Sequence, residues 1–345
     1  MTVRPANLAD AAELRRIDDY VNAHPEAELY HRPQWSVAVE EGCRQRSHYL
    51  IAEGRNGLAG CLPLTEIRSP LFGNALVSVG FGTGGGPIAD DPATTDALVG
   101  AGWKIAERLG CRSMELRGGP VPEGWTEQTG VYVDFSKDLP EGDEAILRAM
   151  KRRHRSIRRA REFDLAVHIG RGEGDREMHY AVYCEMVRNL GSPVYPRTLF
   201  AAMLDRFGDD ADILTVLKDG RPLASALNFY FRGTAMPYWG GGNAAAREYS
   251  ASEMMYYQVM CHARRRGCTR FNFGRSKVGT GTHAFKSNWG FDANPLVYAV
   301  RTADGAAPRS VNPLDPKYRM QVALWKKLPL PLANRIGPHI ARGLG

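Results

Sequence analysis

The sequence predicts an α/β protein built from two copies of one domain, each with a mixed sheet. The same order of elements occurs twice: two helices, a hairpin, a strand, a glycine-rich stretch, a long helix and a strand. Two pairs of motifs also recur roughly 155 residues apart, which is too long a period for a solenoid. They are the glycine triplets at 84–86 and 240–242 and the Gly-Cys helix ends at 110–111 and 267–268. A hairpin followed by strand, helix and strand gives a sheet that is antiparallel first and parallel later.

The first copy is expected over residues 1–143. Asp10 is suited to cap its first helix, and Asn56-Gly57 is a strong hairpin signal. The expected elements are helices over 11–22 and 33–42, strands over 48–52, 58–66 and 75–79, a glycine-rich loop over 80–87, a helix over 92–109 and a strand over 113–117.

The second copy is expected over residues 144–304. Its elements are helices over 176–190 and 196–207, strands over 213–218, 222–231 and 236–239, a glycine loop over 240–243, a helix over 252–266 and a strand over 270–273. A proline-rich tail, residues 305–345, should add a short helix over 316–327. We expect that helix to dock on the second domain, with contact at a membrane surface through Trp325–Leu330 as the alternative.

Composition favours a globular protein without a membrane span. Apolar residues make up 43% of the chain and charged residues 24%, and no uncharged apolar run reaches the length of a spanning helix. The first residues lack the apolar core of a signal peptide, so a cytoplasmic protein is expected, peripheral at the inner membrane if the tail binds there. None of the six cysteines forms a Cys-x-x-Cys pair, so reduced core thiols and no metal site are expected.

The segment 144–162 is expected to form one basic helix between the two domains. Its apolar residues fall on one stripe, and most of its cations fall on the opposite face. Arg153 is the exception, because it lies on the apolar stripe and is therefore expected to point into a cleft as a substrate-binding residue. The cations expected to bind a phosphate or polyanion are Lys151, Arg152, Arg155, Arg158 and Arg159.

A solvated helix face is the simpler explanation of such a charge run, but no acid interrupts it between Arg148 and Arg161. Transfer RNA, a nucleotide-diphosphate sugar and an anionic polysaccharide all remain open as the polyanion.

The stretch from Phe271 to Phe291 is the expected active site. A strand there runs into Gly274-Arg275-Ser276-Lys277, and a Gly-Thr-Gly loop and Phe285-Lys286 follow. Backbone amides and cations at a strand end suit an anionic or carbonyl-bearing substrate. The expected substrate-binding residues are Asn272, Arg275, Ser276, Lys277 and Trp289, together with Asn228, Tyr230, Tyr238 and Trp239 of the preceding strands. Ser250 is expected to cap the next helix, whose free amides could hold an anion.

The duplication, the basic segment ending at Arg161 and the Phe285-Lys286 to Trp289-Gly290-Phe291 motif resemble FemAB-like proteins. These proteins carry two acetyltransferase-like (GNAT) domains, so the resemblance implies a tandem GNAT-like fold. The segment 271–291 and the tail segments 312–319 and 328–334 most resemble the branch found with exosortase/PEP-CTERM and exopolysaccharide gene clusters.

The resemblance implies a function and a catalytic lysine. Characterised FemAB relatives transfer an amino acid from aminoacyl-tRNA to an amine of a peptidoglycan precursor, without a tightly bound cofactor or a metal. Lys286 matches the lysine of the family's Phe-Lys motif, which is thought to stabilise the oxyanion of acyl transfer. Asn272 stands where relatives commonly have an acid, and His283 is a candidate base at a position that is often aromatic in relatives. The first copy lacks both motifs, so it is expected to support the second.

Three functions are left open by the sequence. The first is an N-acyl or aminoacyl transferase that uses an aminoacyl-tRNA-type donor on an amine of an envelope or exopolysaccharide precursor. The second is an acyl-CoA-dependent GNAT acetyltransferase acting on an amino sugar or a lipid-linked intermediate. The motif Gln/Arg-x-x-Gly-x-Gly/Ala that cradles the CoA pyrophosphate is absent from both copies. The third is a non-enzymatic protein that binds an anionic polymer or RNA.

Overall fold

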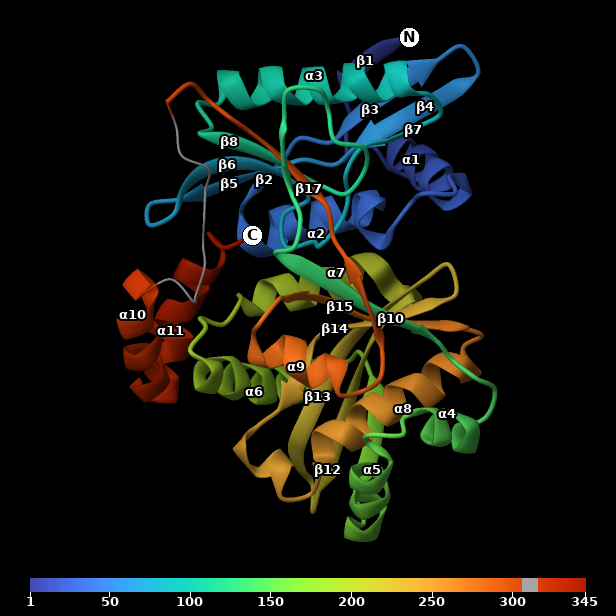
Figure 1. Ribbon diagram of the computed structural model, residues 1–345, viewed down its shortest axis with the longest axis vertical. Helices are drawn as coiled ribbons and strands as arrows, with labels where there is room; N and C mark the ends of the chain where they lie inside the picture. The colour runs from blue at the N-terminus through green and yellow to red at the C-terminus, as the bar shows by residue number, and fades with distance from the viewer. Residues whose placement is uncertain (306–315) are drawn as a thin grey trace. The chain divides into compact units, whose positions relative to one another are not determined.

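The computed structural model describes residues 1–305 and 316–345, so the 312–315 part of the tail motif lies outside the described residues. The chain forms two compact units, each an α/β structure with a mixed sheet (Figure 1). Among the described residues, the first unit comprises 1–130, 296–305 and 338–345, and the second comprises 131–295 and 316–337.

The elements of the first unit follow the predicted order. They are β1 (Thr2–Pro5), α1 (Ala11–Ala23), α2 (Pro33–Cys43), β2 (Arg46–Ser47), β3 (Leu50–Gly54), β4 (Gly57–Leu62), β5 (Thr65–Ser69), β6 (Gly73–Ser78), β7 (Ile88–Ala89), α3 (Pro92–Arg108), β8 (Ser113–Arg117), β9 (Thr126–Gln128) and β17 (Tyr298–Thr302). One sheet has the order β1-β3-β4-β7 and another the order β2-β5-β6-β8-β17-β9. The predicted strand 58–66 is thus two strands that belong to different sheets.

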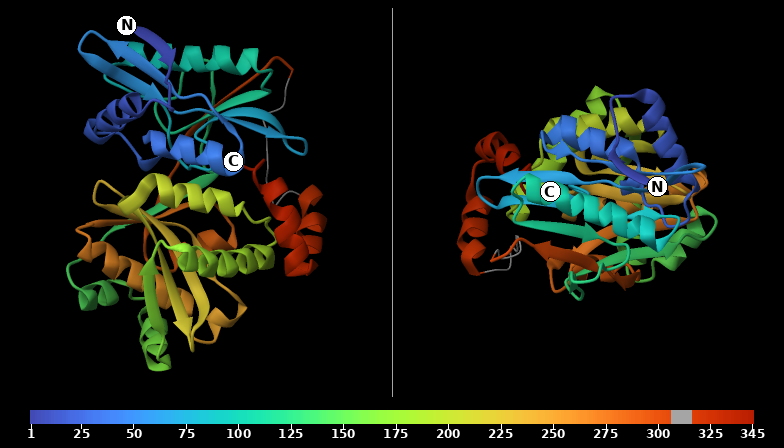
Figure 2. Two further views of the ribbon diagram at one scale, coloured as in Figure 1. Left: turned by 180° about the vertical axis from the view of Figure 1, so that it is seen from behind. Right: turned by 90° about the horizontal axis from the view of Figure 1, so that it is seen from above.

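One core cluster of the first unit lies between α3 and the sheets, and Figure 2 shows α3 beside the strands. Leu98 and Ala106 of α3 pack in one cluster with Leu62, Leu76 and Leu116 of the strands. Asp10 caps α1 as predicted, because its carboxylate accepts a hydrogen bond from the Ala12 N–H at 2.8 Å.

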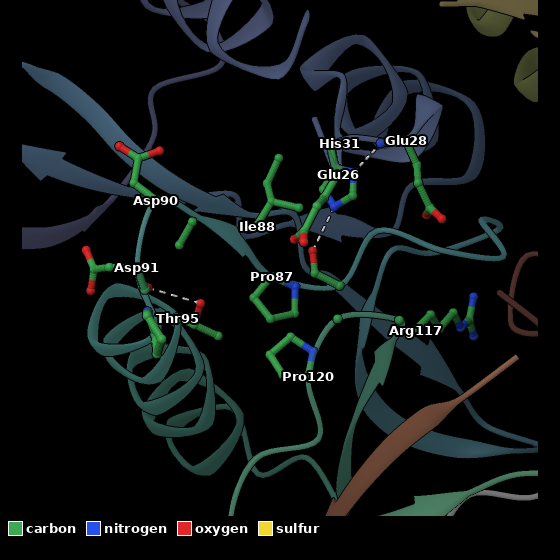
Figure 3. Close-up of a pocket in the computed structure, with 15 residues that line it drawn as sticks. Glu26, Glu28, His31, Pro87, Ile88, Asp90, Asp91, Thr95, Arg117 and Pro120 are labelled. Carbon is green, nitrogen blue, oxygen red and sulfur yellow. Dashed lines mark hydrogen bonds between the residues drawn. The ribbon is translucent and has the colours of Figure 1, made fainter. Parts of the chain in front are cut away.

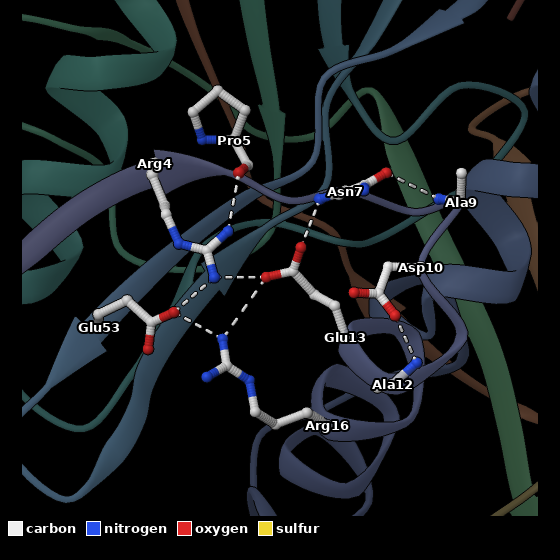
Figure 4. Close-up of polar contacts among 9 residues, drawn as sticks. All are labelled: Arg4, Pro5, Asn7, Ala9, Asp10, Ala12, Glu13, Arg16 and Glu53. Carbon is white, nitrogen blue, oxygen red and sulfur yellow. Dashed lines mark hydrogen bonds and ion pairs between the residues drawn. The ribbon is translucent and has the colours of Figure 1, made fainter.

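Ion pairs hold the N-terminal strand and helix to the β3–β4 hairpin. Glu53 of β3 pairs with Arg4 of β1 at 2.7 Å and with Arg16 of α1 at 2.5 Å (Figure 4). Arg4 also pairs with Glu13 of α1. Hydrogen bonds from Arg16 and Arg4 lower the pKa of Glu53, so the carboxylate stays ionised.

The second unit contains a single continuous sheet in its described residues, in the order β11-β12-β13-β14-β15-β10-β16. Its elements are β10 (Tyr132–Asp138), α4 (Asp143–Ala149), α5 (His154–Ala160), β11 (Ala166–Gly170), α6 (Glu173–Leu190), α7 (Arg197–Phe207), β12 (Ala211–Lys218), β13 (Arg221–Phe231), β14 (Thr234–Gly242), α8 (Ala251–Arg265), β15 (Arg270–Lys277), α9 (Gly281–Ser287), β16 (Asp292–Pro295) and α10 (Pro316–Lys327). Helix α11 (Leu330–Ala341) begins in this unit, and its last residues belong to the first.

Alternation along β13 places helices on both faces of this sheet. Ala224 and Ala226 belong to the cluster that contains α8. The next residues along the strand face the other way, and the Phe229 ring lies 4.9 Å from the Phe207 ring of α7. The strands β14 and β15 pair in parallel only at Thr234–Ala235 and Arg270–Phe271, so they separate beyond that point.

The boundaries between the two units differ from the expected ones, because β10 and β17 each pair with the sheet of the unit to which they were not assigned. The sequence boundaries at 143/144 and 304/305 put β10 in the first domain and β17 in the second. The strand β10 instead pairs with β15 and β16, and β17 pairs with β8 and β9. Pairing between strands so distant in sequence leaves no local signal, so composition could not reveal it.

Three local predictions need correction. The segment 144–162 is two helices with a turn at 150–153, because the Met150 N–H bonds back to Ile146 and Leu147 and the chain turns there. Gly240–Gly242 continue β14 and form no loop, since they pair with Ala224–Ala226 of β13. The tail contains a second helix, α11, that was not predicted; Pro331 lies in its first turn, where proline costs no hydrogen bond, and Pro338 lies inside it.

Candidate active site

Lys286 lies in α9, beside the end of β15. Its ammonium group donates hydrogen bonds to the carbonyl oxygens of Gly274 at 2.9 Å and Arg275 at 3.0 Å. Burial lowers the pKa of Lys286 from 10.5 to about 8, against the opposing effect of the Asp134 carboxylate. The amine is therefore mostly protonated at pH 7 and carries a third N–H donor beyond the two that it gives to the chain.

A bulge in β15 presents the two carbonyls to Lys286. The pairing of β10 with β15 shifts register between Asp134 and Ser136, and Gly274 has a φ of +72°. A side chain at this left-handed position would be strained, which is the reason for glycine there. The Asn272 side chain fixes the bulge, because its Oδ1 accepts the Gly274 N–H at 2.5 Å.

The carboxylate of this region comes from β10. Asn272 Nδ2 donates to Asp134 Oδ2 at 2.9 Å, and burial raises the pKa of Asp134 while the Lys286 charge opposes the rise. Hydrogen bonds thus run from Asp134 through Asn272 and Gly274 to Lys286. We call Lys286, Asn272, Asp134 and the Gly274 and Arg275 carbonyls the Lys286 site.

Sequence reasoning missed Asp134. The signal was an acid between two apolar residues in Val133-Asp134-Phe135, whose neighbours are both buried. It went unused because no strand was predicted here and the segment fell within the first domain.

The other predicted residues of this motif lie around the Lys286 site. The Arg275 guanidinium lies 4.5 Å from the centre of the Tyr132 ring on β10, and the Lys277 amine lies 5.9 Å from it. Burial lowers the pKa of Lys277. Ser276 is buried, and its hydroxyl makes no hydrogen bond within the described part of the chain. His283 is one turn before Lys286 on α9, and its ring is 5.5 Å from the Phe135 ring.

Arg153 joins the basic segment to α9. Its guanidinium lies 5.3 Å from the centre of the Phe285 ring and 6.0 Å from that of the buried Trp289, and it pairs with Glu253 of α8 at 3.2 Å. These are cation–π distances. Arg153 therefore points inward beside the residue that precedes Lys286, as its place on the apolar stripe suggested.

The remaining cations of the segment face outward. Lys151, Arg152, Arg155, Arg158 and Arg159 are all exposed, while Ile146 and Ile157 are buried beneath them. The predicted division into an apolar and a basic face is present, although a turn interrupts the helix.

Asn228 and Tyr230 lie elsewhere on the sheet, in a buried network. Both donate at 2.9 Å to Asp212 Oδ1 on β12, and His262 Nε2 lies 3.0 Å from Asp212 Oδ2. Tyr230 pairs with Ala235, which pairs with Phe271, so the network around Asp212 and the Lys286 site are separated by the strand β14. These side chains provide the hydrogen bonds that the buried Asp212 carboxylate requires.

Tyr238 and Trp239 pack in an aromatic cluster. Their rings are 4.7 Å apart, and the Trp239 ring lies 5.2 Å from that of Phe200. The strand is irregular here, since Leu227 pairs with Trp239 but Asn228 pairs with Pro237, so the register shifts at Tyr238.

The turn after β14 is poorly suited to a pyrophosphate. The Ala244 N–H donates to the Glu185 carboxylate at 3.0 Å, and the Ala246 N–H donates to Asn243 Oδ1 at 3.2 Å. A carboxylate already occupies the anion position, so a diphosphate there would be repelled. Ser250 precedes α8 but its side chain makes no capping hydrogen bond, which corrects that prediction.

The first unit has a cavity of about 640 Å³ lined in part by β7, the start of α3 and the end of β8 (Figure 3). Its lining includes the carboxylates of Glu26, Glu28, Asp90 and Asp91. The one lining guanidinium, that of Arg117, donates to Glu115 and to the carbonyls of Val79 and Gly82 and so is engaged within the unit. This cavity was not predicted, and its charge suits a phosphate poorly.

Comparisons with known proteins agree with this fold. Residues 147–287 match the family model described as the acetyltransferase (GNAT) domain, a class that takes acyl-CoA as co-substrate. No curated protein matches the sequence significantly.

Solved structures resemble nearly the whole chain. FemX is 13% identical with a TM-score of 0.65, over 86% of this chain and 97% of FemX. L-PGS from Bacillus licheniformis is 12% identical with a TM-score of 0.56, over 92% of this chain and 98% of that one. A tandem GNAT protein from the clavulanic acid biosynthesis pathway is 10% identical with a TM-score of 0.53, over 90% and 99%.

At such identities the structural likeness shows the fold, and the predicted tandem GNAT-like architecture is confirmed. The non-enzymatic alternative is not retained, because the family match is to a domain of enzymes. Residues 147–287 are therefore a GNAT-type acetyltransferase domain within a FemAB-like fold, and the chain is an acyltransferase.

Proposed function

We propose that the chain is a FemAB-like N-acyl or aminoacyl transferase whose reaction takes place at the Lys286 site. The observation that supports this most is the ammonium of Lys286, anchored by two carbonyls and still able to donate one hydrogen bond. In the reaction, an acceptor amine attacks the ester carbonyl of the donor, and the carbonyl oxygen becomes negatively charged. The third N–H of Lys286 then stabilises that oxygen, which at a preorganised site contributes on the order of 3 kcal/mol.

In the proposed reaction, the bonds formed match the bonds broken without a cofactor. The amine nitrogen forms the new amide bond, the ester C–O bond breaks, and the proton lost by the nitrogen ends on the leaving hydroxyl. His283, one turn away on the same helix, is proposed to carry that proton, and Arg275 and Lys277 to orient an anionic group of a substrate.

An aminoacyl-tRNA-type donor is favoured by the charges of the second unit. The turn at 150–153 and the outward face of α5 carry five exposed cations, as a phosphate backbone requires. Arg153 continues this positive charge inward to the aromatic rings beside Lys286. Acyl-CoA is the second candidate because the family match is to acetyltransferases, but Glu185 occupies the turn where its pyrophosphate would bind.

The proposed acceptor is an amine of a cell-envelope or exopolysaccharide precursor. This part rests on the sequence resemblance of residues 271–291 to the exosortase/PEP-CTERM-associated branch.

A donor screen tests the chemistry. Mixed aminoacyl-tRNA and a panel of acyl-CoA esters, each with radioactive acyl groups, would be incubated with the protein and an envelope extract, and labelled amide products identified by mass. We expect transfer from aminoacyl-tRNA, a loss of roughly 100-fold or more with Lys286→Met, and a much smaller loss with Lys137→Met, a lysine that also donates to a carbonyl, in a contact that is exposed to solvent. Transfer from acyl-CoA alone would overturn the proposed donor.

The pH profile tests the role of Lys286. A cation that stabilises an oxyanion is lost on deprotonation, so the transfer rate should fall as the pH rises through about 8. The acceptor amine also loses a proton in this range, so the profile is compared with that of Lys286→Arg, whose charge does not titrate. The same profile for both proteins would mean that the charge of Lys286 does not act in the reaction, and the oxyanion role would be wrong.

The basic surface is tested by binding. Arg155→Gln with Arg158→Gln should weaken binding of tRNA and reduce its salt dependence, while Arg55→Gln with Arg221→Gln, at exposed positions elsewhere, should leave both unchanged. Equal effects of the two pairs would mean that tRNA binds by net charge alone.

A further inference from the structure

The tail helices α10 and α11 expose four large apolar side chains. Met320 is 80% exposed, Leu324 64%, Leu332 45% and Ile336 36%. Residues four apart share one face of a helix, so Met320 and Leu324 form a stripe on α10, and Leu332 and Ile336 form one on α11. The two helices lie side by side at the edge of the second unit (Figures 1 and 2).

Small residues occupy the inward face of α11. Ala333 and Gly337 are buried, and a Cβ at Gly337 would lie only 3.0 Å from the backbone nitrogen of Val194. Asn334 Nδ2, on the same side, lies 3.2 Å from Cys184 Sγ on α6. A helix that only packs on its domain buries its large apolar residues and exposes small or polar ones. Here this arrangement is inverted, so docking on the domain does not account for Leu332 and Ile336.

The first tail helix is held to the domain in a similar way. A Cβ at Gly191, after α6, would lie 2.5 Å from a Val322 methyl, and Arg188 Nη1 donates to the Lys326 carbonyl at 3.2 Å. Leu190 at the end of α6 is 54% exposed and adds to the apolar surface nearby.

Positive charge accompanies the apolar stripes. Residues 319–337 contain no Asp or Glu, and their four cations, Arg319, Lys326, Lys327 and Arg335, are all exposed. None of the four forms an ion pair with another described residue. Their charge is therefore available to an external anionic surface.

We propose that α10 and α11 dock on a bilayer surface that contains anionic lipids. The apolar stripes would enter the boundary between headgroups and acyl chains, and the cations would contact the lipid phosphates, as amphipathic helices do at interfaces. The helices lie on the membrane and do not cross it, since no helix among the described residues is long and apolar enough to span a bilayer. This surface is separate from the Lys286 site. The proposal therefore does not depend on which donor the enzyme uses.

Vesicle binding tests the proposal with the full chain. The fraction of protein that floats with vesicles of phosphatidylglycerol and phosphatidylcholine would be compared with the fraction that floats with phosphatidylcholine alone. We expect binding to the first and little to the second. Lys326→Gln with Lys327→Gln should weaken the partition coefficient about 25-fold, on the order of fivefold for each cation. Leu324→Gln with Ile336→Gln should weaken it on the order of 100-fold.

Matched controls separate this surface from others. Val167→Gln with Ile169→Gln replaces exposed apolar residues on β11 and should leave binding unchanged. Arg155→Gln with Arg158→Gln removes cations from α5 and should also leave it unchanged. Because the altered side chains are exposed, the melting temperature of each variant should match that of the unaltered protein, which checks folding.

Three outcomes would overturn the proposal. In the first, the unaltered protein fails to float with phosphatidylglycerol vesicles at low salt. In the second, the α5 variant loses vesicle binding while the tail variants keep it, which would assign lipid binding to the basic surface of α5. In the third, the apolar tail variant changes a dimer into a monomer by light scattering and leaves floatation intact, which would make a second copy of the chain the occupant.

Discussion

Replacing Lys286 by methionine should change how the free energy of unfolding depends on pH. Burial lowers the pKa of this amine from 10.5 to about 8 in the folded chain. The difference between the two pKa values corresponds to about 3 kcal/mol. Between these pH values the unfolded state binds more protons than the folded state, so stability rises with pH there. Below pH 8 the charged amine is buried, and the cost of burying it is present in full.

Comparing the unaltered protein with Lys286→Met isolates the contribution of the Lys286 amine. Relative to Lys286→Met, the unaltered protein should gain about 2 kcal/mol between pH 7 and pH 9.5, because most of the linkage falls in that range. Urea unfolding followed by circular dichroism at several pH values measures the difference, and all other titrating groups cancel.

Lys137→Met serves as the control. The Lys137 amine also donates to a backbone carbonyl, that of Gly290 at 2.9 Å, but in a contact that is exposed to solvent. Its curve should run parallel to that of the unaltered protein. If the Lys286→Met curve is parallel as well, Lys286 is not desolvated in the folded chain, and the reasoning about its environment fails.

Three further predictions concern stability. Asn272→Asp would place a second carboxylate 2.9 Å from Asp134; one of the two must bind a proton, so the variant should lose on the order of 2 kcal/mol at pH 8 and recover most of it below pH 5, by urea unfolding. Tyr230→Phe removes one hydrogen bond to the buried Asp212 and should cost roughly 1–3 kcal/mol in the same assay, whereas no loss would mean that the carboxylate is solvated. Gly86→Ala would put a methyl 2.0 Å from a backbone carbonyl, so the melting temperature should fall by several degrees, on the order of 5 °C or more; an unchanged value would contradict that close approach.

Local patterns in the sequence were sufficient for much of the fold. The duplicated order of elements, the helix that starts after its Asp10 cap, and the strand Ser113–Arg117 all depend on residues close together in the chain. The same holds for the basic surface of 144–162, because the period of a helix determines which side chains point outward. Lys286 was identified by its motif, and its catalytic role stays a prediction.

Tertiary structure decided what depends on pairing across long distances in the chain. The strand β10 joins the second unit by pairing with β15, and only that pairing brings Asp134 to Asn272 and so to the carbonyls that hold Lys286. The glycine triplet 240–242 became part of β14 because β13 supplied hydrogen-bonding partners, which no local propensity specifies. Likewise, the tail sequence showed amphipathic residues, but the contacts of Ala333 and Gly337 with the domain determined that the large apolar side chains face outward. Burial and strand register are properties of the whole fold, and for that reason the chain's chemistry is set by contacts that the sequence order does not display.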